Sequence, residues 1–596
     1  MRNHVFVCLL IPALVIGAVS NPFQKRIPKD SEAIHALTRL TYGPRAGDIE
    51  EVRKLGVKKW IDMQLDPKSI PENPKLEASL KLLDSLRMTP VEMVQHYPDQ
   101  NTIQAYVRGN GNGMGMMGMG MVSSDPVLKA RLERIAKRFR ARMNGEDAPR
   151  PKPMDQVLSA EELTAFRSAS PAEKGKLLAA MPEEKLANVM EAMPPPMRQM
   201  AMMSADPEVR RKVTVATQPQ QIIINDLMEA KLLRAIESTH QLEELLVDFW
   251  YNHFNVFLEK GQDRILVTSY ERDAIRPHVL GKFKDMLQAT AEHPAMLFYL
   301  DNWQSVSNDA PSFGRQKRGL NENYARELLE LHTLGVDGGY TQKDIIDVAR
   351  CFTGWTIAQP RQGSGFQFNE RFHDKGEKTV LGVKIAAGGG KEDGLKVLDI
   401  VLHHPSTARF LSKKLAMRFV SDNPPKELID RMAKTYTTTD GDLKAMMRTM
   451  LESKEFWSEG AMNAKMKSPL EMVVSAVRAT NAEVFAPFAL VQQLQQLGQP
   501  LYRKIEPTGY SSANDEWTNS AALLARMNFA LTLAMNRVPG LKVDTSMFTK
   551  AAVADVIAKE LLFHESSPAT RAALATEKEP AKIAGLVLGS PEFQRR

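Results

Sequence analysis

From residue 221 to the end of the chain, apolar residues recur at spacings of three and four almost without interruption. The run 222–236 shows the pattern first, and the segments 241–250, 274–291 and 395–403 repeat it. This spacing places apolar side chains along one stripe of an α-helix, and such a stripe is stable only when it is buried against other helices. The sequence therefore predicts a mainly α, multi-helix globular core over residues 221–596.

Strand signals are few. Short alternating runs occur at 365–368 and 379–385, and the turn-forming residues 374–376 lie between them. These two runs could pair as a hairpin. We therefore expect at most one small β-hairpin beside the helices.

The rest of the chain divides by composition. Residues 21–70 carry short helical patterns that we assign to the core. Over residues 71–220, Pro, Met, Ala, Lys and Glu dominate, which indicates an insertion. Within it, residues 109–121 (GNGNGMGMMGMGM) have low complexity and predict a flexible, dispensable loop. Three 11-residue repeats over 159–191 predict short helices in series, a helical arm on or beside the core.

The first twenty residues predict export. Arg2 is followed by an apolar run at 5–19 and by small residues at 18–20, which is typical of a secretory signal peptide cleaved before Asn21. We expect a periplasmic or extracellular protein. At about 15 residues, the run is shorter than the roughly 20 that cross a bilayer, so no integral span should remain after cleavage. An uncleaved N-terminal anchor is the alternative.

Charge and cysteine content exclude some classes of protein. The 78 Lys and Arg residues exceed the 71 Asp and Glu residues by seven, an excess too dilute over 596 residues to indicate a nucleic-acid partner. One of the two cysteines, Cys8, lies in the signal segment and the other is Cys351. The exported chain would therefore contain no internal disulfide, and packing alone must stabilise it.

The segment 320–356 (LNENYARELLELHTLGVDGGYTQKDIIDVARCFTGWT) is the most informative part of the chain. On a helical wheel at about 100° per residue, Arg326, Glu327 and Glu330 lie on one side. His332 lies on the opposite side with the apolar residues. We therefore expect the histidine to face the interior.

The same segment also predicts where its helices begin and end. Gly335 should end the first helix, and a tight glycine-rich loop follows. Thr341 and Asp344 have the spacing of a capping box and should open a second helix. This second helix should end near Gly354 and Trp355, which predicts a helix-loop-helix unit.

Six separated motifs carry a resemblance to a known family. They are the segment above and, in chain order around it, FWYNHFNV (249–256), AIRPHVLG (274–281), HPAMLFYLDN (293–302), LGQPL (497–501) and RMNF (526–529). Together they resemble the uncharacterised bacterial family DUF1800, over roughly 31–70 and 221–596. The resemblance implies a secreted, mostly helical protein, often encoded beside a second secreted family whose fold is like alkaline phosphatase. It implies no activity.

Histidines are the first candidates for chemistry, because imidazole exchanges protons near neutral pH. His332 stands near a helix end, where a role in the helix dipole or a buried hydrogen bond is the alternative. His253 lies among aromatic residues, where a packed helix end is the alternative. His293 is a further candidate histidine. His373 precedes Asp374 in a loop and should be the most exposed of the four, with a simple surface turn as its alternative.

Polar residues at the start of the helix in 320–356 are the second group of candidates. One of two nearby asparagines can cap the helix, but the other has no obvious structural role. Arg326 can pair with Glu330, which leaves Glu327 free to exchange a proton. With the Asp337 loop and His253, this face could close a cleft, although a structural ion-pair network is an equal alternative.

These arguments give one set of candidate residues. The acid or base candidates are Glu327, His332, Asp337 and His373, and the substrate-binding candidates are Asn321, Asn323, Arg326, His253 and Trp355. We expect no metal site, because the local spacings do not match those of known di-iron, zinc-protease or EF-hand sites. The sequence identifies no cofactor.

Two functions remain open. One is a hydrolase or transferase acting on a polar extracellular substrate. The other is a non-catalytic envelope scaffold or a maturation partner of a co-secreted protein of the alkaline-phosphatase-like family. A cleft with mutually facing polar groups would favour the enzyme, and a flat apolar patch would favour the partner.

Overall fold

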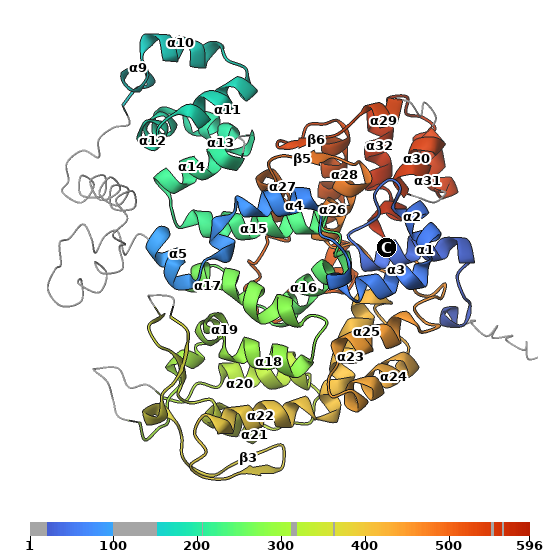
Figure 1. The fold of residues 1–596 in the computed structure, drawn as a ribbon. Helices are drawn as coiled ribbons and strands as arrows, with labels where there is room; N and C mark the ends of the chain where they lie inside the picture. Colours follow the sequence, from blue (N-terminus) through green and yellow to red (C-terminus); the bar gives the residue numbers. More distant parts are fainter. Residues whose placement is uncertain are drawn as a thin grey trace, which may run out of the picture.

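The computed structural model describes residues 21–98, 152–204, 207–310, 319–360, 364–549, 554–562 and 566–596. The predicted signal peptide and the low-complexity segment 109–121 lie outside these ranges. Within them, the chain is mainly α (Figure 1), as the periodicity predicted. The apolar stripes of the helices meet in one large core.

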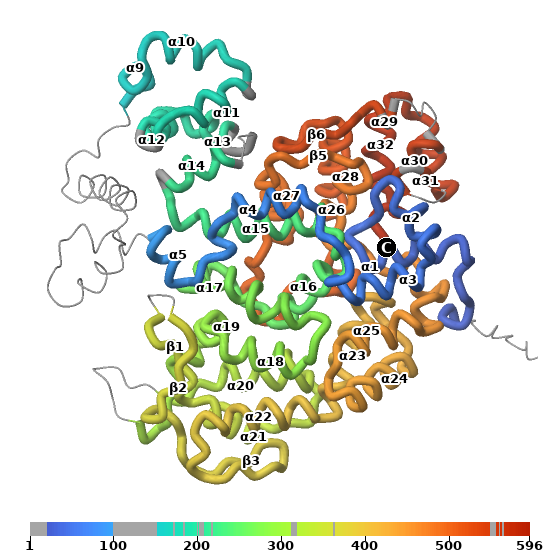
Figure 2. The backbone as a smooth tube through the Cα atoms, viewed as in Figure 1, coloured from blue at the N-terminus to red at the C-terminus, as the bar shows by residue number. Residues whose placement is uncertain are grey.

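The N-terminal helices lie against the core. They are η1 Pro22–Gln24, η2 Lys29–Ser31, α1 Glu32–Leu40, α2 Asp48–Leu55, α3 Val57–Gln64, η3 Pro67–Ser69, α4 Pro74–Lys81, η4 Asp84–Arg87 and α5 Pro90–His96. Ala36 and Leu40 of α1 belong to the main core cluster. In the tube view the first helices of the chain lie beside the last ones (Figure 2), and Thr38 and Phe593 line one shared pocket.

A second, smaller cluster holds the helical arm. Its helices are α9 Met154–Val157, α10 Ala160–Ser168, α11 Pro171–Ala180, α12 Glu183–Ala192, α13 Pro195–Ser204 and α14 Pro207–Thr217. Capping boxes at Ser159 and Ser170 open α10 and α11, as their spacing predicted. Leu158, Phe166 and Val189 are among the residues of a separate apolar cluster, so the arm buries its own small core.

The main body follows the arm. Its first half contains α15 Gln221–Glu237, α16 Gln241–His253, α17 Asp263–Ser269, η5 Tyr270–Ile275, η6 Arg276–His278, α18 Phe283–Glu292, α19 Pro294–Tyr299, η7 Asn302–Gln304, α20 Asn323–Glu327, η8 Leu328–Thr333 and α21 Gln342–Cys351. η5 and η8 are π-helices. Both continue an α-helix directly, and such wider turns are frequent at functional sites.

The second half of the body completes the core. It contains η10 Glu370–Phe372, α22 Glu392–Leu402, α23 Pro405–Phe419, α24 Lys426–Thr438, α25 Leu443–Leu451, α26 Pro469–Ala479, α27 Phe488–Gln496, η11 Asp515–Trp517, α28 Ser520–Ala534, α29 Ser546–Thr549, α30 Ala554–Leu562, α31 Pro568–Leu574, α32 Pro580–Gly589 and α33 Pro591–Gln594. No helix in the described ranges is long and apolar enough to cross a membrane.

Helix α15 lies at the centre of the molecule and is buried on nearly every side. It contacts α14, α16, α17, α26 and α27. Its buried charges are all paired, since a buried charge without a partner is costly: Glu229 pairs with Arg210 at 2.8 Å, and Lys231 pairs with Asp248 at 2.8 Å. This helix therefore connects the arm, the N-terminal helices and the core.

The boundaries at 70 and 220 stay a prediction. The structure divides the contacts of this stretch in two. Leu76, Leu83 and Leu86 of α4 and η4 pack against Ala230 and Leu233 of α15, whereas α9 to α14 surround the arm's own cluster.

The strand prediction was wrong in number and in pairing. The described residues contain three two-stranded antiparallel pairs instead of at most one hairpin. They are β1 Trp355–Ile357 with β2 Phe366–Phe368, β3 Lys378–Val380 with β4 Val383–Ile385, and β5 Glu483–Val484 with β6 Leu541–Lys542. The two predicted runs do not pair with each other, because the second folds back on itself at Leu381 and Gly382, which both have positive φ.

Candidate functional site

The helix that carries His332 ends in a π-turn. After α20, η8 continues with wider turns, and Gly335 ends it with φ +86°, as predicted. A Cβ at this position would meet the Phe410 ring at 2.8 Å, so only glycine fits. His332 faces the interior, as the wheel predicted, and is 1% exposed. Burial, reinforced by Lys414, lowers its pKa to about 3, so the ring is neutral.

His253 is the last residue of α16, and its side chain forms a hydrogen bond with the backbone carbonyl of His332. Its Nε2 lies 2.9 Å from the His332 carbonyl oxygen. Because a carbonyl only accepts, Nε2 carries the proton, and Nδ1 of the neutral ring is then an acceptor. This Nδ1 is buried without a hydrogen-bond partner among the described residues. Burial, with Lys414 and His332 nearby, holds the pKa of His253 well below its usual value.

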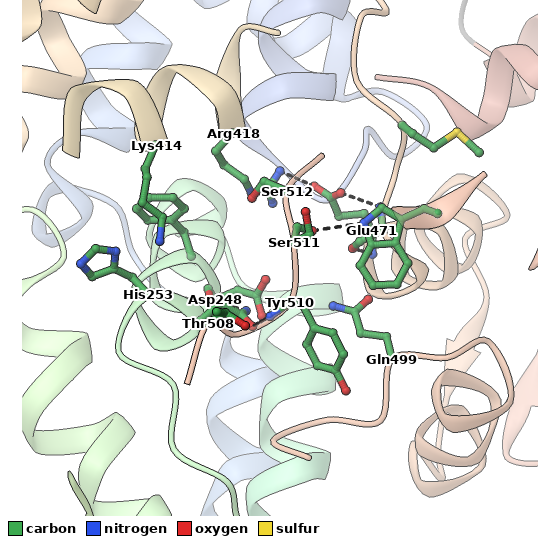
Figure 3. A pocket seen from close by; sticks show the side chains of 15 residues that line it. Asp248, His253, Lys414, Arg418, Glu471, Gln499, Thr508, Tyr510, Ser511 and Ser512 are labelled. Atoms are coloured by element: carbon green, nitrogen blue, oxygen red, sulfur yellow. Dashed lines mark hydrogen bonds and ion pairs between the residues drawn. The ribbon is translucent and has the colours of Figure 1, made fainter. Parts of the chain in front are cut away.

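His253 also lines a polar pocket. The walls come from α16, α23, α26 and the segment 499–517, and this pocket contains Asp248, Lys414, Glu471, Ser511 and Ser512. Figure 3 shows Lys414 and Arg418 leaving the same helix toward the pocket, with the His253 ring beside Lys414. We refer to this cavity as the 253/414 pocket.

Lys414 is the unusual charge of the 253/414 pocket. Burial lowers the pKa of its amine from 10.5 to about 8. No hydrogen bond or ion pair to Lys414 is present in the described part of the chain. Its ammonium lies over the Phe410 ring, 5.5 Å from the ring centre. A partly buried lysine of this kind exchanges its proton near neutral pH, which is the property of catalytic lysines.

The carboxylates of the pocket are already neutralised. Glu471 lies 2.7 Å from Arg418 and 2.9 Å from Arg596. Asp248 lies 2.8 Å from Lys231. Neither acid is therefore left to neutralise Lys414.

The segment 508–512 forms the outer wall of the 253/414 pocket. Gly509 has φ +68°, and a Cβ there would meet the Asn252 carbonyl at 2.2 Å, so glycine permits the close approach to α16. The backbone N–H of Tyr510 then donates to Asn252 Oδ1 at 3.0 Å. These contacts position the hydroxyls of Ser511 and Ser512 opposite Arg418 (Figure 3).

The polar face of α20 lies apart from His332. Arg326 contacts Glu322 and Glu330, each at 3.4 Å, and Gln342 at 3.2 Å. Asp337 is exposed in the following loop. Arg326 and its two glutamates form a surface ion-pair network, which the sequence left as an alternative, and no ion pair to Asp337 is found in the described ranges.

The two asparagines before this face have local roles or none. Asn321 Oδ1 accepts from the backbone N–H of Asn323 at 2.9 Å, which is a helix-start contact. Asn323 itself is exposed. The structure therefore divides the predicted group, because His332 joins His253 in the core while the other members stay near the surface.

Glu327 is the one member of this face with a strongly shifted acidity. It is half-buried, and neither a hydrogen bond nor an ion pair to it is found in the described ranges. Burial, with Glu330 close by, raises its pKa to about 7. Glu327 can thus exchange a proton at neutral pH.

His373 was expected to be the most exposed of the candidate histidines, and this prediction was wrong. Its side chain is buried, with Nδ1 2.9 Å from the Thr353 carbonyl and Nε2 3.2 Å from Asp393. Asp393 also binds Lys378 at 2.6 Å. The loop is buried because this cluster ties it to α22.

Trp355 does not line the 253/414 pocket. It begins β1 and is 0% exposed, with its ring against the Cα of Gly394 in α22, where a Cβ would come within 2.9 Å of three ring atoms. The second helix of the predicted unit opens with the Thr341 and Asp344 capping box, as predicted, but ends at Cys351. Trp355 is therefore a core residue of a short strand.

No group of three His, Cys, Asp or Glu side chains in the described part of the chain is placed to hold a metal ion.

The family model for "Protein of unknown function (DUF1800)" matches residues 35–595. The chain belongs to the DUF1800 family. The matched range includes residues 71–220, which the motif comparison had left out. No curated protein and no solved structure matches the chain.

Sequence reasoning missed the most distinctive residue of this DUF1800 chain. Leu411, Lys414, Leu415 and Arg418 share one face of α23, and the leucines belong to the core. A lysine on the apolar stripe of an amphipathic helix was the available signal. Its ordinary interpretation is a side chain that extends back to water. The segment 508–512 gave no signal at all, because it lies far from α16 in the sequence.

Proposed function

We propose that this protein is an exported hydrolase or transferase that acts on a polar substrate in the 253/414 pocket. The observation that carries the proposal is the Lys414 amine, which has a pKa of about 8 and no ion-pair partner in the described ranges, beside the unpartnered Nδ1 of His253. A proton-exchanging group next to a fixed acceptor is the minimum for acid-base chemistry.

The geometry suggests a role for each group. The Lys414 ammonium donates its proton to the leaving group, and the neutral amine that results removes a proton from the attacking hydroxyl or water, which restores the ammonium. His253 Nδ1 accepts a hydrogen bond from the attacking group and orients it, because its tautomer is fixed by the His332 carbonyl. The Ser511 and Ser512 hydroxyls contact the polar substituents of the substrate.

A turnover assay tests this proposal. Purified protein is incubated with chromogenic esters, glycosides and amides at pH 6 to 9. Lys414→Met should lower the rate on any substrate at least about 100-fold, the effect typical of a lost general base. Lys413→Met is the matched control, because Lys413 is the exposed neighbour on the same helix and should keep full activity. Equal rates for both variants, or no turnover by wild type, would overturn the proposal.

Export is part of the proposal and has its own measurement. The apolar run at 5–19 and the small residues after it support cleavage before Asn21. N-terminal sequencing of the protein from its native envelope should begin at Asn21. An intact Met1 would instead indicate an anchored protein.

The alternative is a non-catalytic partner of a co-secreted alkaline-phosphatase-like protein. It is supported by Leu523 and Leu524, which are 43% and 64% exposed near the start of α28. Under this alternative, Leu524→Glu would abolish binding of that protein, whereas Lys414→Met would not change it.

A further inference from the structure

We propose that the substrate of the 253/414 pocket carries an anionic oxygen group, either a phosphate or sulfate ester or a carboxylate, that binds the Lys414 ammonium. This inference rests on the proposed function, because it concerns the same pocket. It specifies the chemistry of the ligand.

The first argument is the charge balance of the pocket wall. The wall and its direct partners hold four cations, Lys231, Lys414, Arg418 and Arg596, against two carboxylates, Asp248 and Glu471. Both histidines nearby, His253 and His332, are neutral because burial lowers their pKa values. The pocket wall and its direct partners therefore carry an excess of positive charge.

The second argument concerns where this excess is located. Arg418 and Arg596 share Glu471, and Lys231 is held by Asp248. Lys414 alone among these cations has neither a hydrogen bond nor an ion pair in the described ranges. An anion that displaces water here gains a charge-assisted contact and displaces no existing ion pair.

The third argument is the set of neutral donors that line the same pocket as the ammonium. The Ser512 hydroxyl lines the pocket, and no hydrogen bond to its oxygen is found in the described part of the chain. Ser511 Oγ accepts from the Ala513 N–H at 3.0 Å, so its own proton is free to point into the cavity. Hydroxyl donors in a pocket that also contains an unpaired lysine suit ligand oxygen atoms that carry negative charge.

The step that binds the anion is a simple ion pairing. Below pH 8 most of Lys414 is already an ammonium, and the remaining neutral amine takes up a proton from the acid form of the buffer. The ligand oxygens accept hydrogen bonds from this ammonium, and no other covalent bond forms or breaks. An opposite charge within about 4 to 6 Å favours the charged form, so the ligand should raise the pKa of Lys414. Each unit of that rise lowers the fraction of reactive amine roughly tenfold at a fixed pH below it.

The test measures the reactivity of single lysines by mass spectrometry. The full-length protein is pulse-labelled with a neutral amine reagent from pH 6 to 11. Inorganic phosphate, inorganic sulfate, succinate or chloride is added in separate samples at equal ionic strength. With chloride, labelling of Lys414 should have its midpoint near pH 8. With the bound anion, the midpoint should rise by about one unit, and the labelling rate at pH 7.5 should fall roughly tenfold.

The arms distinguish the source of the anionic oxygens. A shift with phosphate or sulfate only indicates a tetrahedral ester group, and a shift with succinate only indicates a carboxylate. Lys413 is the internal control, since it is exposed on the same helix and should label identically in all samples. No anion-dependent shift at Lys414, or an equal shift at Lys413, would overturn the inference.

A second variant separates binding from catalysis. Ser512→Ala should weaken the anion-dependent shift severalfold and leave the chloride midpoint near pH 8, because it removes a donor but no charge. If the shift is present while every chromogenic substrate is left unchanged, the anion site stands and the enzymatic proposal fails. If turnover depends on Lys414 while no anion shifts its labelling, the enzymatic proposal stands and this inference fails.

Discussion

At the scale of single residues, Lys414 is the strongest indication of a functional site, because burying its ammonium lowers the stability of the folded protein. A cation that is partly buried without a carboxylate partner destabilises the folded state, and a sequence selected only for folding would place an apolar residue there. Stability that is sacrificed at a cavity is the usual sign of a functional group. The cost can be measured through its pH dependence.

Lys414→Met should raise the thermal unfolding midpoint at pH 7. The folded-state pKa is about 8 and the ordinary value is 10.5. Below pH 8 the amine is charged in both the folded and the unfolded state, so the full cost is present. Between pH 8 and 10.5 the folded protein loses the proton first, and the cost disappears. The gain of the variant should therefore be largest at pH 6 to 7 and vanish near pH 10.5.

The matched control is Lys413→Met, which should show no such pH-dependent gain because Lys413 is exposed. A Lys414→Met protein that is less stable than wild type at pH 7 would mean that the ammonium has a stabilising partner after all.

Glu327 gives the opposite pH dependence. Its pKa is raised from 4.5 to about 7, and no hydrogen bond or ion pair holds it in the described ranges. Below pH 4.5 the carboxyl is neutral in both states and costs nothing. Between pH 4.5 and 7 the unfolded state loses its proton first, so the destabilisation grows with pH. Glu327→Gln should match wild type in urea midpoint at pH 4.5 and exceed it above pH 7.

Glu330→Gln serves as the comparison on the same face. Glu330 pairs with Arg326, so its replacement should give no gain above pH 7. A clear loss of stability in Glu327→Gln would show that Glu327 belongs to the structural network instead.

At the scale of elements, the loop around His373 is held by a buried ion cluster. Asp393 of α22 binds both His373 and Lys378, and the side chains of Lys378 and Asp393 are 0% and 3% exposed. Asp393→Asn keeps the shape but leaves Lys378 charged and poorly compensated. Removing one partner of a buried pair costs about 3 to 5 kcal/mol, and chemical unfolding should show a loss of this size.

The exposed pair Lys375 and Glu370 lies in the same loop and provides the control. Their side chains are 63% and 72% exposed, so Glu370→Gln should leave the unfolding midpoint unchanged. Similar losses in both variants would contradict the buried-cluster explanation.

Local sequence patterns predicted where individual helices begin, but they did not predict which segments pack or pair with one another. The capping boxes at Ser159, Ser170 and Thr341 were visible because the groups that satisfy each other lie three residues apart. The pairing of β1 with β2 could not be predicted, because it depends on which segments the folded chain brings side by side. The burial of His373 could not be predicted either, because it depends on Asp393, which lies twenty residues away in α22.

At the scale of the whole molecule, the fold class followed from periodicity, whereas the pocket did not. Periodicity repeats along the chain and is read from one segment at a time. The 253/414 pocket combines α16, α23, α26 and the segment 499–517, and no spacing in the sequence links them. Most predicted candidates lay in the helix-loop-helix segment 320–356, and the only candidate that lines the pocket, His253, lies outside that segment.

The attachment of the helical arm to the main body also depends on contacts that no local sequence pattern indicates. The arm has its own core, so its attachment depends on contacts of α14 with α15 and of α13 with α27. Arg210 and Glu229 form a buried pair across this junction at 2.8 Å, with side chains 3% and 6% exposed. Arg211 adds ion pairs to Asp226 and Asp84 beside it. These charges fix the arm to the central helix.

Arg210→Met should release this junction. Glu229 would be left in a buried site without its cation, and burial already raises its pKa to about 7. The stability of the junction should fall by about 3 kcal/mol or more, which raises the equilibrium constant for local opening roughly 100-fold. Hydrogen exchange of residues 207–217 at pH 8 should therefore speed up by that factor, while exchange in α26 and α28 should not change. The effect should shrink as the pH falls below 7 toward 4.5, because Glu229 then takes up a proton in the folded variant and no longer needs a cation.

The double replacement Arg210→Met with Glu229→Leu tests the cause. It removes the uncompensated carboxylate and fills the same space with apolar groups, which often restores or exceeds the original stability. Exchange in 207–217 should return close to the wild-type rate. If the double variant opens as fast as the single one, specific pairing itself fixes the arm. If neither differs from wild type, the apolar contacts between α14 and α15 are sufficient and the buried pair is not what attaches the arm.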